Sequence, residues 1–213
     1  MARNAILMKL LPSKYLDAFL DGHLFMNTPG YFKDLEAGDL VRADLDEGIH
    51  TSLQAAEVSI KSDEGEWIPI GGLINPVTYR TEEAANYNMF CMYALQEFID
   101  GPIDDRNLAF GDTFVVITNA DEFLRRVQEA ADKVGRYYQS SLIDYVDRST
   151  YHGVMGPFRK FSSFSYQQEF RMVLHAGDGH PTTLSIGDIR DICIHGLSAE
   201  INQRLRRAPN TVT

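Results

Sequence analysis

The spacing of apolar residues along the chain predicts more strands than helices. Residues 89–95 and 113–117 form almost wholly apolar runs that are too short for buried helices, which is typical of strands inside a core. Residues 5–11 and 23–27 are two further strand candidates, and a Pro-Gly turn signal follows the second. Shorter stretches predict the remaining strands, at 55–61, 67–70, 142–146, 169–174, 182–186 and 192–195.

Three segments have helical spacing instead. Asn119 and Glu122 form a capping-box pattern, and apolar residues then recur at intervals of three and four as far as Gly135. Residues 12–22 begin with proline, end with glycine and carry apolar groups at helical spacing. A terminal helix is expected at 199–207.

Because strands outnumber helices and do not alternate regularly with them, we expect an α+β fold with mixed or antiparallel sheets. No linker divides the chain, so residues 1–213 are interpreted as a single domain, with 208–213 as a candidate flexible tail. Residues 62–66 separate two strand candidates and predict a hairpin. Residues 31–52 are acidic and weakly patterned, which predicts a long loop with short helical pieces.

Composition narrows the class of protein. Hydrophobic residues make up 44% and charged residues 23% of the 213, which is ordinary for a globular chain. No apolar run approaches the roughly 18 residues that a membrane span needs, and no signal peptide is recognised. Cys91 and Cys193 both stand in apolar runs, so free thiols are expected. These features favour a soluble, cytoplasmic protein without membrane contact.

The net charge of −10, from 20 basic and 30 acidic residues, disfavours non-specific binding to nucleic acid. Acidity of this kind is most often a solubility device, and a surface that mimics nucleic acid is the rarer alternative. The six histidines show no metal-ligand spacing, so no metal is expected.

The segment around Glu169 is the sharpest chemical feature. On a strand, Gln167, Glu169 and Arg171 would share one face, opposite an apolar face. One interpretation is a solvated face with a cross-strand ion pair. The other is an amide and a carboxylate that are presented together to a ligand, where they could stabilise a developing cation.

Several short motifs occur in a recognisable order. They are residues 24–28, Phe-Lys-Asp-x-Glu at 32–36, Asp-Leu-Asp-Glu-Gly at 44–48, the apolar run at 89–92, and 166–171 after Lys160. Together they resemble an uncharacterised bacterial and phage group that is related to the abortive-infection AbiGi-type proteins. This resemblance implies the ADP-ribosyltransferase fold, with NAD as substrate.

The resemblance also implies roles for individual residues. Lys9 on the first strand would hold NAD, although the family usually has arginine or histidine there. Thr28 or its neighbour Asn27 would support the nicotinamide ribose. Glu169 would be the catalytic glutamate, and Gln167 would occupy the position two residues before it. A carboxylate there would stabilise an oxocarbenium-like ribose.

The long loop at 31–52 is a candidate lid over the expected NAD-binding cleft between Lys9, Thr28 and Glu169. Tyr31 and Phe32 could stack on the nicotinamide or the adenine, and Arg42 could reach a phosphate. The alternative is a solvated acidic loop that packs only through its two aromatic residues.

Two functions therefore compete. The first is an NAD-dependent ADP-ribosyltransferase-like protein in phage–bacterium conflict, acting on a protein or nucleic acid as toxin, anti-phage defence or counter-defence factor. The second is a non-catalytic acidic binding or inhibitor protein that blocks or senses a macromolecule or nucleotide. Under the first, Glu169→Gln should abolish activity and cost less than about 1 kcal/mol of stability. Unfolding of this variant would instead reveal a buried structural ion pair of Glu169 with Arg171 or Lys160.

Overall fold

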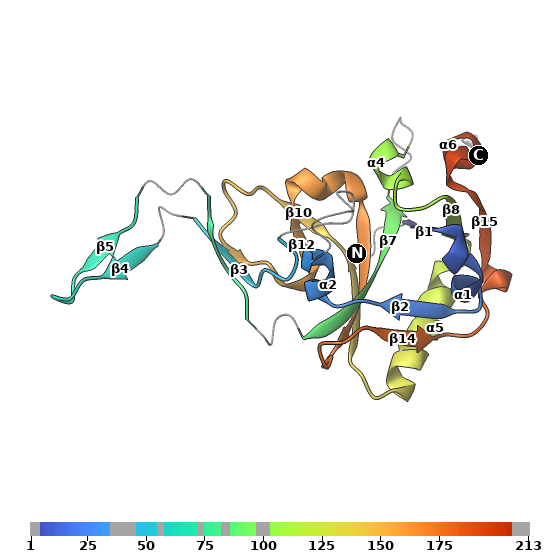
Figure 1. The fold of residues 1–213 in the computed structure, drawn as a ribbon, viewed down its shortest axis with the longest axis horizontal. Coiled ribbons are helices and arrows are strands. Elements are labelled where there is room, and N and C mark those ends of the chain that lie inside the picture. The colour runs from blue at the N-terminus through green and yellow to red at the C-terminus, as the bar shows by residue number, and fades with distance from the viewer. Residues whose placement is uncertain are drawn as a thin grey trace, which may run out of the picture.

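A six-stranded antiparallel sheet organises the chain in the computed structural model, which describes residues 5–34, 46–54, 58–71, 75–81, 86–96 and 103–205. The strand order is β15-β8-β1-β7-β13-β9 (Figure 1). Its strands are β1 (Ile6–Leu11), β7 (Tyr87–Leu95), β8 (Thr113–Ile117), β9 (Tyr138–Leu142), β13 (Glu169–His175) and β15 (Cys193–Leu197).

Smaller sheets and short helices surround this central sheet. One antiparallel ribbon joins β2 (His23–Met26) to β14 (Thr182–Ser185), and a parallel pair joins β10 (Asp144–Val146) to β12 (Arg159–Phe161). A three-stranded sheet has the order β11 (Gly153–Val154), β3 (Thr51–Leu53), β6 (Val77–Tyr79). The helices are α1 (Leu16–Leu20), α2 (Pro29–Asp34), α4 (Asp105–Leu108), α5 (Ala120–Lys133) and α6 (Ile201–Arg204). The fold is therefore α+β, with several antiparallel sheets and few helices.

The central sheet is buried on both faces, which explains the apolar runs in β7 and β8. On one face, here called the helix face, side chains from β1, β7, β8 and β13 pack against α5 and the β2–β14 ribbon. On the opposite face, Met8, Leu10, Tyr93 and Phe114 form a second core with Ile201 of α6. Side chains that alternate along β8 and most of β7 are thus buried and apolar in both directions.

The helix predicted after Asn119 is confirmed. The Asn119 side chain accepts a hydrogen bond from the backbone N–H of Glu122, and α5 then runs for 14 residues. Its buried residues are Phe123, Val127, Ala130 and Ala131, which follow the expected spacing. Helix propensity, cap and burial agree here, so local sequence was sufficient to predict the element.

Elsewhere the boundaries differ from the sequence interpretation. Residues 12–22 hold a 3-10 turn followed by α1, and the expected strand at 142–146 divides into the end of β9 and β10. Before β8, the chain also forms the short helix α4, and the Asp104 side chain caps it by accepting a hydrogen bond from the N–H of Arg106. The terminal helix is shorter than expected, and residues 206–213 lie outside the described residues. Among the described residues, no helix is long and apolar enough to cross a membrane.

The turn between α1 and β2 depends on glycine at position 22. Gly22 has φ +81°, and a Cβ atom there would lie 1.9 Å from the carbonyl oxygen of Gly187. The Gly22 carbonyl also accepts a hydrogen bond from the N–H of Ile186 at 2.9 Å. The close approach of the two backbones leaves no room for a side chain.

We expect Gly22→Ala to lower the free energy of unfolding by about 3 kcal/mol or more, because backbone strain and a backbone clash add. Gly135→Ala is the matched control. Gly135 also has positive φ (+67°) but no atom within 4 Å of its Cβ position, so about 1–2 kcal/mol is expected. Urea unfolding measures both, and equal losses would show that the Gly187 contact is unimportant.

Candidate functional site

The candidate catalytic glutamate, Glu169, begins β13 in the middle of the sheet. β13 pairs with β7 on one side and with β9 on the other. Glu169 and Arg171 therefore point to one face of a fully paired strand, and only 6% and 1% of their surfaces are exposed. The expectation of a solvated polar row is wrong, because further segments of the chain cover this face.

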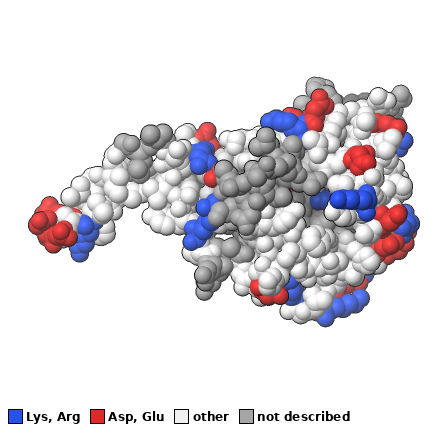
Figure 2. All heavy atoms as spheres, in the orientation of Figure 1, with Lys and Arg blue, Asp and Glu red and all other residues white. Residues whose placement is uncertain are grey.

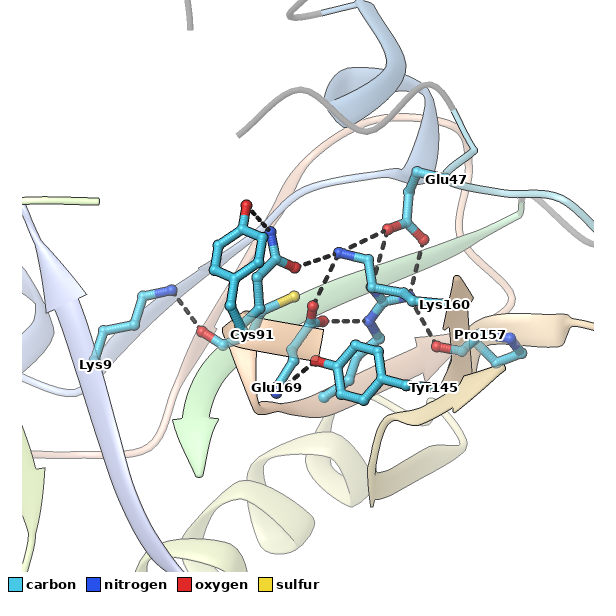
Figure 3. A network of polar contacts seen from close by, with 10 residues as sticks. Lys9, Glu47, Cys91, Tyr145, Pro157, Lys160 and Glu169 are labelled. Carbon is cyan, nitrogen blue, oxygen red and sulfur yellow. Dashed lines mark hydrogen bonds and ion pairs between the residues drawn. The ribbon is translucent and has the colours of Figure 1, made fainter. Parts of the chain in front are cut away.

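Arg171 is the centre of a buried ion cluster, which consists of Glu47, Lys160, Glu169 and Arg171 (Figure 3). Arg171 Nε donates to Glu169 Oε1 at 2.7 Å. Its Nη1 and Nη2 donate to the two carboxylate oxygens of Glu47 at 2.8 and 2.9 Å. Nη1 also donates to the carbonyl oxygen of Pro157 at 2.8 Å. Paired N–H bonds to one carboxylate are the strongest geometry available to a guanidinium group.

Lys160, from β12, supplies the second cation. Its Nζ donates to Gln167 Oε1 at 2.8 Å and to Glu169 Oε2 at 3.1 Å, and lies 3.8 Å from Glu47 Oε2. The hydroxyl of Tyr145 accepts a hydrogen bond from the backbone N–H of Glu169. Both oxygens of the Glu169 carboxylate are therefore engaged by cations of the same chain.

Gln167 reaches the ion cluster from outside the strand. It ends a 3-10 turn at Ser162–Gln167, and Gln168 then adopts a left-handed conformation with φ 39°. The expectation that Gln167 and Glu169 extend one strand face is corrected in this respect. Lys160 still brings their two side chains together, because its ammonium group contacts both.

The charges of the ion cluster balance one another without a ligand. Two carboxylates face two cations, so its formal charge is zero. Burial alone would raise the pKa of Glu169, but the charges of Arg171 and Lys160 outweigh it and hold that pKa well below its usual value. Glu169 is thus ionised, as a stabiliser of positive charge must be, but cations already neutralise it.

Cys91 lies on β7 beside these groups and is not an activated nucleophile. Burial and the neighbouring Glu169 carboxylate raise the pKa of the Cys91 thiol to about 12. The thiol is therefore protonated at neutral pH, and a protonated thiol is a poor nucleophile. Cys91 and Cys193 are both free, as expected.

Lys9 lies on the opposite side of the sheet from Glu169. Met8 pairs with Tyr93, which also pairs with Glu169, so these three side chains share a face. Lys9, one residue further along β1, points to the helix face, and its ammonium is 4.3 Å from the centroid of the Phe90 ring. Its Nζ donates to the carbonyl oxygen of Cys91 at 2.6 Å (Figure 3). The structure does not bring Lys9 and Glu169 into one cleft.

Of the other residues expected to bind NAD, Thr28 and Asn27 make contacts within the fold, and Phe32 lies on the Glu169 face. The hydroxyl of Thr28 accepts the N–H of Tyr31 at 3.4 Å, at the start of α2. Asn27 forms an isolated bridge with Met89 of β7. Phe32 packs beside Tyr87, Met89 and Val173, whereas Tyr31 is 42% exposed. Arg42 lies outside the described residues.

Two described parts of the candidate lid lie against the Glu169 face. α2 packs there through Phe32, and the turn at 46–48 delivers Glu47 to Arg171. Residues 35–45 between them lie outside the described residues.

A small depression adjoins the ion cluster, and its lining includes Glu47, Gly48, Met155, Gly156 and Lys160. It encloses about 250 Å³ of empty space, its open mouth included. Even with this open solvent counted, the volume is below the roughly 300–1,000 Å³ of usual ligand pockets, so the depression is too small for a dinucleotide in the described conformation. Within the described ranges, no group of three or more His, Cys, Asp or Glu side chains could hold a metal ion.

The alternative of a buried ion pair between Glu169 and Arg171 or Lys160 is confirmed, because both cations contact its carboxylate. Sequence reasoning missed the role of Glu47. Glu47 was one acidic residue among several in a loop, and 124 positions separate it from Arg171. A buried arginine requires carboxylate partners, but spacing along the chain does not reveal which ones will reach it.

The buried ion cluster replaces the expectation of a mild Glu169→Gln phenotype. Removing the charge leaves Arg171 and Lys160 with one carboxylate fewer in a buried setting, so we expect about 3–5 kcal/mol lower unfolding free energy. Glu200→Gln removes the surface pair with Arg204 and should cost less than about 1 kcal/mol. Urea denaturation compares them, and a Glu169→Gln loss below about 1 kcal/mol would contradict a structural role.

Acid should destabilise the wild type through the same carboxylate. The folded-state pKa of Glu169 is depressed, so its contribution is fully present above the unfolded value of about 4.3 and is lost as pH falls toward the folded value. Unfolding free energy measured between about pH 6 and 3 should fall more steeply for wild type than for Glu169→Gln. Parallel curves would show that Glu169 does not contribute to the pH dependence.

Comparisons with models of protein families, with curated proteins and with solved structures gave no match to this chain.

Proposed function

We propose that this chain is a non-catalytic acidic binding protein, which blocks or senses a macromolecule in the conflict between phage and bacterium. The observation that carries the proposal is the internal neutralisation of Glu169. Both of its carboxylate oxygens contact buried cations, at 2.7 Å from Arg171 and 3.1 Å from Lys160. The conflict setting follows only from the resemblance in sequence motifs.

A carboxylate that stabilises a cationic ribose must lie close to the reacting ring, with its charge available to it. At Glu169, two cations compete for that charge, and the side chain is 6% exposed. The adjacent depression is small for a dinucleotide, and Lys9 faces the other side of the sheet. These three features all disfavour NAD cleavage in the described conformation.

The net charge of −10 indicates the chemistry of the partner. A strongly acidic protein is attracted to basic surfaces and repelled by nucleic acid itself. We therefore infer a basic macromolecule as target, such as a protein that binds nucleic acid. Association of this kind should weaken as salt is raised.

ADP-ribosyl transfer by an ADP-ribosyltransferase-like fold is the second candidate. One observation favours it: Gln167 and Glu169 share the ammonium group of Lys160, and α2 and Glu47 lie over the same face. NAD could enter only if the turn bearing Glu47 moved away from Arg171. The resemblance proposed above supplies the rest of this candidate.

Labelled NAD distinguishes the two functions. Wild-type protein, incubated with 32P-NAD and bacterial lysate, is expected to release no nicotinamide and to transfer no label. Affinity capture should recover one stoichiometric partner, and an increase in salt concentration should release this partner. The binding proposal would be contradicted if wild type transferred label, if Gln167→Ala abolished this transfer and if Glu200→Gln preserved it. That result would establish the transferase.

A further inference from the structure

Residues 58–70 form a hairpin, here called the arm, that extends away from the rest of the molecule (Figure 1). Its strands are β4 (Ser59–Lys61) and β5 (Trp67–Pro69), and every residue in them is exposed. Ile60 is 59% exposed, Trp67 69% and Ile68 51%. An isolated two-stranded hairpin is only marginally stable in water, so the arm needs a further apolar surface.

Both faces of the arm carry large apolar groups. Ile60 pairs with Ile68, so these two side chains share one face, and Lys61 pairs with Trp67 on the other. A hairpin that lies on a protein surface normally has one polar face. The arm is therefore suited to insertion against a partner, with Trp67 as its largest anchor.

A second exposed apolar surface lies on the sheet from which the arm emerges. Val154, Thr51 and Tyr79 form a cross-strand row in the β11-β3-β6 sheet. Tyr79 is 49% and Val154 52% exposed, whereas Ser52, on the other face, is fully buried. We call the outer row the root face. Its position follows from chain order, because the arm leaves β3 and returns to β6.

Charges differ between the two ends of the arm. The turn at its free end carries exposed Asp63, Glu64 and Glu66, seen as an acidic cluster in Figure 2. Arg159 lies beside the root face, since its Nη1 donates to the carbonyl oxygen of Val154 at 2.9 Å. The side chains of Arg148 and Arg159 are 43% and 40% exposed. Figure 2 also shows basic side chains where the arm joins the body.

Each of these arginines can donate hydrogen bonds to an additional carboxylate. Arg148 pairs with Asp46, while Arg159 Nε and Nη1 donate to Asp144 and to the carbonyl oxygen of Val154. A guanidinium group has five N–H donors, so these contacts do not exhaust it.

We propose that the arm docks on the root face of a second copy of this chain, and that the second copy's arm docks in return. A two-fold axis perpendicular to the arms makes them antiparallel, so each acidic end meets Arg159 beside the root face of the other copy. Trp67, on one face of the arm, then contacts the Tyr79–Val154 row, whereas Ile60 and Ile68 lie on the opposite face. Because the interface is isologous, it closes at the dimer. The proposal does not depend on whether Glu169 is catalytic.

Sedimentation equilibrium at about 0.15 M salt tests it first, where screening over roughly 8 Å limits repulsion between two acidic chains. Wild type should be a dimer in the micromolar range. Trp67→Ala should weaken the dimer about tenfold or more, and by more than Ile60→Thr, which changes the opposite face of the arm. Ile194→Thr is the matched control, since Ile194 on β15 is also 59% exposed, and it should leave the dimer unchanged. A wild-type monomer throughout this range would overturn the proposal and leave the arm to a different protein.

Charge exchange tests the reciprocal pairing directly. The double variant Asp63→Lys/Glu66→Lys and the variant Arg159→Glu should each weaken self-association, because like charges then meet. Mixed together they should form a heterodimer, in which both arm–root contacts regain opposite charges. Thermal melting confirms that each variant is folded. Failure of the folded variants to associate when mixed would refute the arrangement.

Discussion

The guanidinium group of Arg171 is the constraint on which the candidate site depends. It is 1% exposed, and a buried charge of this kind must be paired and hydrogen-bonded, because its desolvation is costly. Glu169, Glu47 and the Pro157 carbonyl satisfy it from three separate segments. The pairing thus holds the turn at 46–48 and the segment before β12 against the central sheet. Much of the covering of this sheet face follows from one side chain.

The same pairing determines how the candidate catalytic residues are interpreted. A carboxylate beside an amide and an ammonium group is compatible with an active site and with a structural ion cluster. An active site differs from a structural ion cluster in that a ligand can reach its carboxylate and that other charges of the protein do not neutralise this carboxylate. In the described structure the charges sum to zero and the neighbouring depression is small, so the arrangement is complete without a ligand. The binding proposal follows from this completeness.

The body and the arm use their apolar residues differently. In the body, the central sheet is covered on both faces, by α5 and the β2–β14 ribbon on one side and by α6 and neighbouring segments on the other. In the arm, Trp67 and its apolar neighbours remain exposed on a two-stranded hairpin. Hydrophobic burial therefore explains the body within one chain, but leaves the arm in need of a second surface.

Local sequence determined the elements whose signals act over a few residues. The apolar runs that became β7 and β8, the capped helix α5 and the hairpin of the arm could all be predicted, because period, cap and turn chemistry agree within each segment. Tertiary structure alone decided which side chains meet. Lys9 and Glu169 fall on opposite faces because strand register sets their direction, and no local pattern specifies the register of distant strands. Likewise, Glu47 reaches Arg171 across 124 positions, since a buried charge takes the partner that folding brings to it.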